Sequence, residues 1–118
     1  MGDGEAAVRD VLRRGLERAG YRVDVCSDGL EVWRLYRPGT YDLIVLEASL
    51  SRRAGIEVVA RVRDRGDDVP ILLMSADAQG ARRAAAFAFT YRLELLEKPF
   101  GWADLRRAVE RVTRRSLP

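Results

Sequence analysis

The sequence predicts an α/β protein with a doubly wound parallel sheet and helices on both of its faces, in three layers. Along the whole chain, segments with helical spacing of apolar residues alternate with short continuous apolar runs. Strands that alternate with helices in this way imply right-handed crossovers and a parallel sheet. The length of 118 residues suits one domain. We therefore expect a single domain over residues 1–118, with five helices and four strands.

The helices are recognised by apolar residues three or four positions apart. The first contains Val8, Leu12 and Leu16, and it ends near Gly20, a residue suited to the left-handed conformation that closes many helices. Four further segments show the same spacing: Val32 to Tyr36, Ile56 to Val62, Gln79 to Phe89, and Leu105 to Val112.

The strands are predicted from four short runs bounded by turn residues. The runs around Ile44 and Leu72 are continuously apolar, which is typical of strands covered on both faces. The four predicted strands are Tyr21–Cys26, Leu43–Leu46, Ile71–Met74 and Leu93–Leu96.

Composition excludes several classes of protein. The single cysteine, Cys26, cannot form an internal disulfide, and a chain without histidine has no Cys/His zinc site and no His general base. No apolar run of about 18 residues and no export signal is present, so we expect a cytoplasmic protein. The formal charge of +3 permits an acidic partner, and of the 21 basic residues only Lys98 is a lysine.

Polar residues follow several of the predicted strands. Glu47 comes directly after one strand, Ser75 after the next, and Lys98 after the last. Functional groups in open α/β sheets gather at the carboxyl ends of the strands. We therefore expect a carboxylate, a hydroxyl and an ammonium to converge on one rim of the sheet.

These positions belong to a longer series of motifs, which includes Ser27-Asp28-Gly29, Tyr41-Asp42-Leu43-Ile44, Gly55 eight residues after Glu47, and Lys98-Pro99-Phe100. In its order and spacing the series resembles the receiver domain of two-component response regulators, over essentially the whole chain. The resemblance implies a flavodoxin-like fold. It also implies a phosphoryl group accepted by an Asp, Mg²⁺ held by acidic residues, a Ser/Thr that contacts the phosphoryl oxygens, and a Lys that neutralises charge.

Carried over by position, the resemblance assigns the phosphoryl contacts to Ser75 and Lys98. The acceptor position is occupied by Glu47 instead of Asp, and the position of a frequent aromatic switch is Leu95. Alternatives remain for these residues, since Ser75 can also cap a turn, Glu47 can be a solvated carboxylate and Lys98 can be a plain surface lysine.

The metal site and the first strand also depart from the family. The paired acids correspond to Asp3 and Gly4, so we expect Mg²⁺ to bind weakly at Asp3 and no other cofactor to bind. Only two residues precede Asp3, which predicts that the family's first strand is absent. We then expect the strand Tyr21–Cys26 to pair directly with Leu43–Leu46, and leftover apolar surface to favour association, with a homodimer as one form of it.

Taken together, these features predict a divergent receiver of the pseudo-receiver type, a signalling module and not an enzyme, in which Glu47 prevents phosphorylation or mimics its product. The alternatives are a residual Mg²⁺-dependent phosphoacceptor and a basic nucleic-acid adaptor, the latter less favoured because no recognition motif accompanies the arginines. We expect a protein partner, either a histidine-kinase relative or an effector, on a basic face that comprises Arg82, Arg83, Arg92, Arg106 and Arg107.

The larger aromatic residues are predicted to serve packing and not ligand binding. Trp33, Trp102, Phe87 and Phe89 lie in helical segments, where aromatic residues more often serve packing than ligand binding. We therefore expect all four to pack in the core or on helix faces.

Overall fold

The computed structural model describes residues 6–24, 29–47, 55–75, 78–98 and 100–113, with side chains omitted at 6–9, 78, 80, 81, 83 and 84. Five helices and three strands lie within these ranges. In chain order they are α1 (Ala6–Arg18), α2 (Gly29–Leu35), β1 (Ile44–Glu47), α3 (Gly55–Asp64), β2 (Ile71–Ser75), α4 (Ala78–Tyr91), β3 (Leu93–Glu97) and α5 (Trp102–Thr113).

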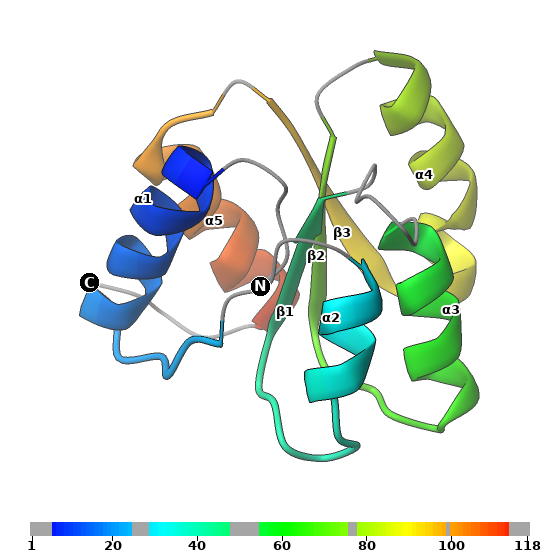
Figure 1. Cartoon of the computed structure of the whole chain (residues 1–118). Coiled ribbons are helices and arrows are strands. Elements are labelled where there is room, and N and C mark those ends of the chain that lie inside the picture. Colours follow the sequence, from blue (N-terminus) through cyan, green and yellow to red (C-terminus); the bar gives the residue numbers. More distant parts are fainter. Residues whose placement is uncertain (1–5, 25–28, 48–54, 76–77, 99, 114–118) are drawn as a thin grey trace.

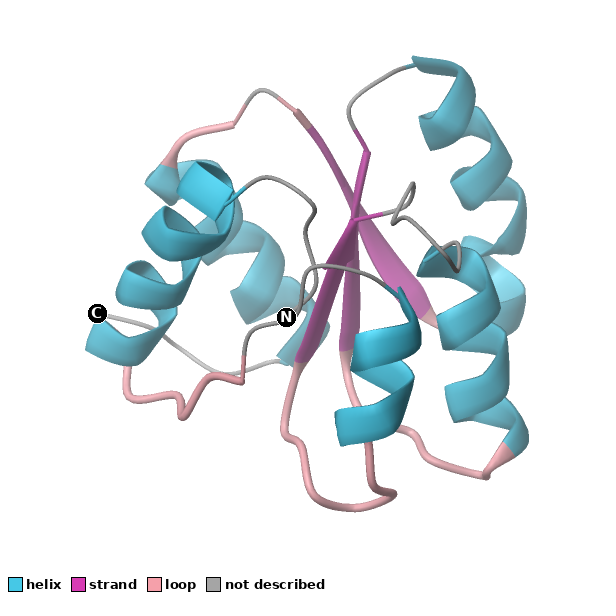
Figure 2. Ribbon diagram, viewed as in Figure 1, coloured by secondary structure: helices cyan, strands magenta, loops and turns pink. Residues whose placement is uncertain are grey.

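The elements form three layers around a parallel sheet of order β1-β2-β3. Helices α1 and α5 cover one face of the sheet, and α2, α3 and α4 cover the other (Figure 1). Figure 2 shows the strands sandwiched between these two groups of helices. The doubly wound, receiver-like α/β fold predicted from the sequence is confirmed.

Each strand supplies both halves of the core because its side chains alternate between the two faces. Ile44 and Leu46 pack with α2 and α3 in one cluster, whereas Val45 packs with α1 and α5 in the other. Leu73 and Leu72 on β2 divide in the same way, and both are fully buried. The continuously apolar runs in the sequence therefore reflect helices on both sides of the sheet.

The segment 21–24 differs from the prediction of a fourth strand. It carries no strand, although Tyr21 and Val23 pack against the core cluster beneath α1 and α5. A cavity of about 30 Å³ lies between this segment and β1, lined in part by Val23, Leu43 and Val45. Side-chain packing thus holds the segment near β1 without a ladder between 21–24 and that strand. Residues 25 and 26, and the N-terminal residues 1–5, lie outside the described part.

The helices α1 and α4 are each followed by a residue with a left-handed backbone conformation. Gly20 has a φ of 97°, and the backbone N–H of Tyr21 donates to the carbonyl of Leu16 at 3.1 Å, so the predicted glycine cap of α1 is confirmed. After α4, Arg92 adopts a left-handed φ of 55°, which is uncommon for a residue with a side chain.

A half-buried arginine on α3 holds the turn at Arg92 in place. The Arg63 guanidinium donates to four backbone carbonyls, at 2.6 to 3.0 Å, those of Tyr91, Arg92, Asp67 and Val69. It therefore ties the end of α4 to the turn that follows α3, and it offsets the strain at Arg92.

The described helices are all too short or too polar to cross a bilayer.

Candidate functional site

The candidate site lies at the carboxyl end of the sheet, where the fold brings the ends of three parallel strands together. Glu47 is the last residue of β1, Ser75 is the last of β2, and Lys98 directly follows β3. Glu47 is opposite Met74 in the β1–β2 register, and Ser75 is opposite Glu97 in the β2–β3 register. The three residues that the sequence placed on one rim therefore lie on neighbouring strands.

Glu47 and Lys98 form an ion pair across this rim. Lys98 Nζ lies 2.6 Å from Glu47 Oε2, and the side chains are 16% and 8% exposed, respectively. The contact is an ion pair and not an aligned hydrogen bond. Because little water reaches either group, the attraction is screened less than on the surface, and the two charges compensate one another.

The backbone positions Lys98 for this contact. Its N–H donates to the Ser75 carbonyl at 2.7 Å, which continues the β2–β3 ladder one residue beyond β3. Ser75 itself is buried, with 2% of its surface exposed. A side chain that starts from this point spans β2 to reach Glu47 on β1, which requires the length of a lysine.

A Mg²⁺ site is implied by the family resemblance, and the described residues do not provide its ligands. Mg²⁺ takes carboxylate and water oxygens in octahedral geometry. Within the described ranges no group of three or more potential metal ligands is present, and the Glu47 carboxylate faces the Lys98 ammonium. Asp3, the predicted ligand, lies outside the described residues.

The predicted basic face is divided by local ion pairs. Arg92 contacts Asp68 at 2.6 Å, and Arg107 contacts Asp104 within α5 at 2.8 Å. Arg82 is exposed on α4 and Arg106 is half-buried on α5, whereas the side chain of Arg83 is not described. The positive charge of this face is therefore lower than the residue count indicated.

The packing predicted for the aromatic residues holds only in part. Trp33 stacks on Tyr36 with ring centroids 5.6 Å apart and packs against the core. Phe89, in contrast, is 95% exposed, since it lies on the face of α4 turned away from the sheet. Trp102 is 41% exposed and rests on α1.

One feature of α1 was not predicted from the sequence. Val11, Gly15 and Ala19 are spaced four residues apart and so form one row along the helix, which meets the ring of Trp102. The spacing of these three residues is visible in the sequence. That Trp102 on α5 packs against them is defined only by the fold.

The whole chain is similar to known receiver domains. The family model for the response regulator receiver domain matches residues 2–110. The response regulator MprA of Mycobacterium leprae is 35% identical over 119 residues, which cover 98% of this chain and 50% of that protein. The chain thus spans about half the length of the curated relatives it matches.

Solved structures agree with this match. The non-phosphorylated receiver domain of HemR from Leptospira biflexa has a TM-score of 0.86 and 28% identity, and the similarity covers 99% of this chain and 94% of that one. Full-length FixJ from B. japonicum has a TM-score of 0.75 and 28% identity, over 96% of this chain and 55% of that one. Together with the rim geometry, these similarities establish that the chain belongs to the family of response regulator receiver domains of two-component signalling.

Proposed function

We propose that this receiver domain is an interaction module that does not accept a phosphoryl group and that holds a permanent charge pair where phosphorylation would act. The observation that carries the proposal is the contact between Lys98 Nζ and Glu47 Oε2 at 2.6 Å, in a largely buried position. In the family, the corresponding lysine neutralises charge at the phosphoryl group. Here the lysine is already engaged by the side chain at the acceptor position.

The length of glutamate argues against phosphorylation. Its carboxylate is one methylene, about 1.5 Å, further from the backbone than that of an aspartate at the same position. Phosphoryl transfer depends on close alignment of the attacking oxygen, and a displacement of this size is enough to reduce its rate about 100-fold. The displaced carboxylate also carries one negative charge toward Lys98, whereas a phosphoryl group carries about two. Glu47 therefore imitates the charge of the phosphorylated form in part.

Weak Mg²⁺ binding forms the second part of the proposal. Gly4 replaces one of the family's two acids and leaves Asp3 as the single predicted ligand of that pair. Fewer hard oxygen ligands lower the affinity for Mg²⁺. The combination of Glu47 and Gly4 removes both the attacking group and part of the metal site.

A protein partner follows from this function. A receiver that is not switched by phosphorylation has to act through its surface, and the exposed arginines Arg82 and Arg107 favour an acidic protein. We propose a kinase-related or effector protein in this role, and a homodimer is the alternative that a size measurement distinguishes.

Intact-mass spectrometry after incubation with acetyl phosphate and Mg²⁺ tests the proposal. We expect the mass to remain unchanged over hours, since the acceptor carboxylate is misplaced. The Glu47→Asp variant is the matched control, and it too is expected to gain little phosphate because Gly4 is unchanged. A hydroxylamine-sensitive mass increase of one phosphoryl group on Glu47 of the natural sequence contradicts the proposal. Efficient labelling of Glu47→Asp alone would show that the metal site is intact.

A further inference from the structure

A cluster of basic and aromatic side chains lies on the surface formed by α2 and α3, on the other side of the sheet from α1 and α5 (Figure 1). The guanidinium carbon of Arg61 lies 5.4 Å from the centroid of the Trp33 ring, and that of Arg65 lies 5.1 Å from it. Both distances are within the range of cation–π attraction. One indole ring therefore holds two guanidinium groups, and we refer to Trp33, Arg61 and Arg65 as the Trp33 cluster.

The indole ring of this cluster is itself fixed by packing. Trp33 belongs to α2, stacks on Tyr36 with ring centroids 5.6 Å apart, and packs against the core. Arg61 belongs to α3, and the N–H of Arg65 donates to the carbonyl of Arg61 at 3.3 Å, so the helical geometry continues to Arg65. A side chain that rests on a fixed ring loses less conformational freedom when it binds a ligand. The two guanidinium groups are therefore organised before a ligand arrives.

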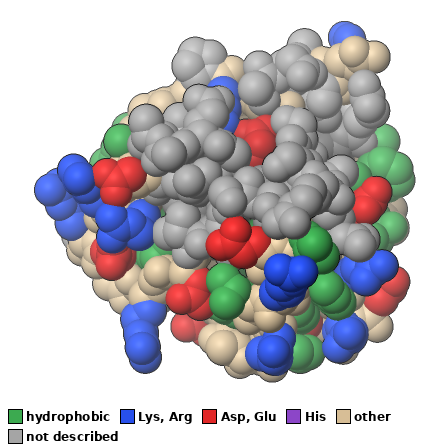
Figure 3. All heavy atoms as spheres, in the orientation of Figure 1, with side chains coloured by type: hydrophobic (Ala, Val, Ile, Leu, Met, Phe, Trp, Pro, Cys, Tyr) green, Lys and Arg blue, Asp and Glu red, His purple; other side chains and the backbone are tan. Residues whose placement is uncertain are grey.

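The two positive charges of the cluster lack acidic partners in the described part of the chain. Neither Arg61 nor Arg65 forms an ion pair there, although Asp64 stands between them in the sequence. Arg92 and Arg107, in contrast, each contact a carboxylate. Both arginines of the cluster are exposed, and Figure 3 shows basic side chains at the lower right, over α2 and α3, with acidic ones among them. The cluster thus offers positive charge to a ligand from outside.

The geometry of the cluster favours carboxylates as ligands. A guanidinium group is planar, and the N–H groups along its edge can donate two parallel hydrogen bonds to one carboxylate. Residues four apart on a helix are separated by about 6 Å along its axis, and alternate residues of an extended chain by about 6.6 Å. Two acidic residues that alternate in an extended segment therefore match the spacing of Arg61 and Arg65.

A single-stranded nucleic acid fits the cluster less well. Its binding depends on aromatic rings that offer a face on which a base can stack. The ring of Trp33 is partly buried and already contacts Tyr36 and two guanidinium groups. A base would have to displace one of these contacts, whereas a carboxylate adds to them without changing them.

From these observations we propose that the Trp33 cluster binds an extended acidic segment of a partner protein, with the carboxylates of alternate residues on Arg61 and Arg65. The proposal rests on the proposed function of the domain as an interaction module, and it assigns to that module a surface on α2 and α3. This surface is separate from the Glu47–Lys98 rim, because α3 runs back from that edge of the sheet to the other (Figure 1).

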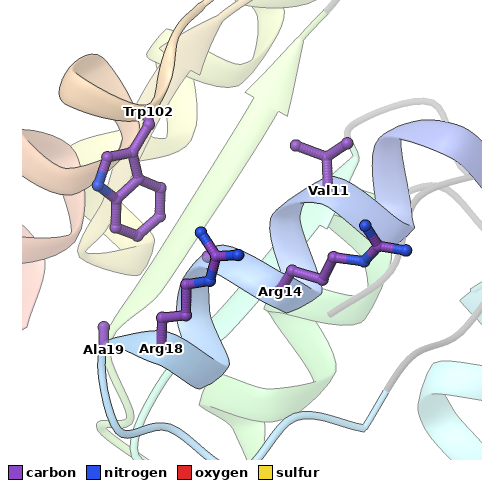
Figure 4. A pocket seen from close by; sticks show the side chains of 6 residues that line it. Val11, Arg14, Arg18, Ala19 and Trp102 are labelled. Atoms are coloured by element: carbon purple, nitrogen blue, oxygen red, sulfur yellow. The ribbon is translucent and has the colours of Figure 1, made fainter.

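Two synthetic peptides test the proposal: one alternates glutamate with serine, and the other has glutamine in place of each glutamate. Binding to the full, unphosphorylated chain is followed by ¹H–¹⁵N NMR of the tryptophan indole N–H groups. The chain has two tryptophans, and Trp102 serves as the internal control because it faces α1 on the opposite side of the sheet (Figure 4). We expect the glutamate peptide to shift the Trp33 signal saturably, with an affinity that falls as salt is added, and the Trp102 signal to remain in place.

Calorimetric titration of variants with the glutamate peptide separates the cluster from the rest of the surface. Arg61→Gln/Arg65→Gln is expected to weaken binding about tenfold or more, because the charge-assisted hydrogen bonds are lost. The matched control is Arg14→Gln/Arg18→Gln, which removes two exposed arginines with the same spacing from α1 and is expected to leave binding unchanged. Arg61→Lys/Arg65→Lys keeps the charge and loses the planar group, so we expect it to bind more weakly than the natural sequence.

Several results overturn the proposal. Equal shifts of Trp33 by the glutamine peptide would remove the argument from charge, and equal loss of affinity in both glutamine double variants would remove the argument from position. Unchanged binding by the lysine variant would remove the argument from guanidinium geometry.

Two further results would assign the cluster to another ligand and so also overturn the proposal. One is tighter binding of an oligothymidylate than of the glutamate peptide at the same salt concentration. The other is a Trp33 signal that changes with protein concentration in the absence of peptide, which would indicate a second copy of the chain. None of these results affects the phosphorylation test, so failure of the Trp33 cluster is distinguishable from failure of the proposed function.

Discussion

Removal of either partner of the Glu47–Lys98 pair is expected to destabilise the fold by different amounts. Lys98→Met leaves a carboxylate that is 8% exposed, whereas Glu47→Gln leaves an ammonium that is 16% exposed on a flexible four-carbon chain. Breaking a fully buried ion pair costs about 3–5 kcal/mol, because the remaining charge loses the opposite charge that it faced. We expect about 3 kcal/mol for Lys98→Met. For Glu47→Gln we expect about 1–2 kcal/mol, since the lysine can turn toward water.

Urea unfolding followed by circular dichroism measures these values, and the double variant Glu47→Gln/Lys98→Met completes a thermodynamic cycle. The double variant removes both charges of the pair, so its loss of stability is expected to fall short of the sum of the single losses by more than about 1 kcal/mol. For a domain of this size, a loss of 3 kcal/mol lowers the Tm by roughly 12 °C. Additive losses, or a smaller loss for Lys98→Met than for Glu47→Gln, would refute the reasoning.

Three further predictions concern other parts of the molecule. Arg63→Gln removes charge-assisted bonds to four carbonyls, so we expect a loss of about 2–4 kcal/mol in urea unfolding, and a loss under 1 kcal/mol contradicts the role given to this side chain. Burial, together with the hydrogen bond to Asp67, raises the pKa of Tyr36 to about 12. Because the folded state favours the neutral phenol, the stabilisation that Tyr36 provides is complete below pH 10 and is lost as the pH rises from about 10 to 12. Tyr36→Phe should abolish this loss of stability at high pH, as measured by unfolding at several pH values. Glu47→Gln should leave the Trp102 indole signal unchanged, because we expect a fixed surface, and a large shift would reveal a two-state equilibrium.

Where apolar residues recur with a clear helical or strand spacing, the bounds of the element could be predicted from the sequence almost to the residue. The glycine cap of α1 fell where the apolar spacing ended, and the run at Ile71–Met74 became a strand with helices on both faces. The segment at Tyr21 could not be predicted in this way. Its β-branched and aromatic side chains pack against the core without a strand being formed. Whether the backbone of such a segment joins a sheet depends on neighbours that are distant in sequence.

The rim residues could be predicted because their positions follow from chain direction. In a parallel sheet the carboxyl ends of all strands share one edge, so Glu47, Ser75 and Lys98 had to lie close together once the strands were assigned. The pairing of Arg92 with Asp68 and the exposure of Phe89 did not follow from the sequence. Both depend on how α4 is rotated and where it ends, which a count of charges or apolar residues does not determine.

Lys98 at the rim and Trp102 on α5 are separated by only three residues in the chain. Lys98 is fixed by its N–H bond to Ser75 and by Glu47, and Trp102 follows four residues later at the start of α5. That start is capped by Asp104, whose carboxylate accepts the N–H of Gly101 at 3.1 Å. Anchors on both sides of the connection therefore hold Trp102 against α1 through groups that this chain supplies itself. We expect a surface built in this way to form without phosphorylation, which is what the proposed interaction module with glutamate at the acceptor position requires.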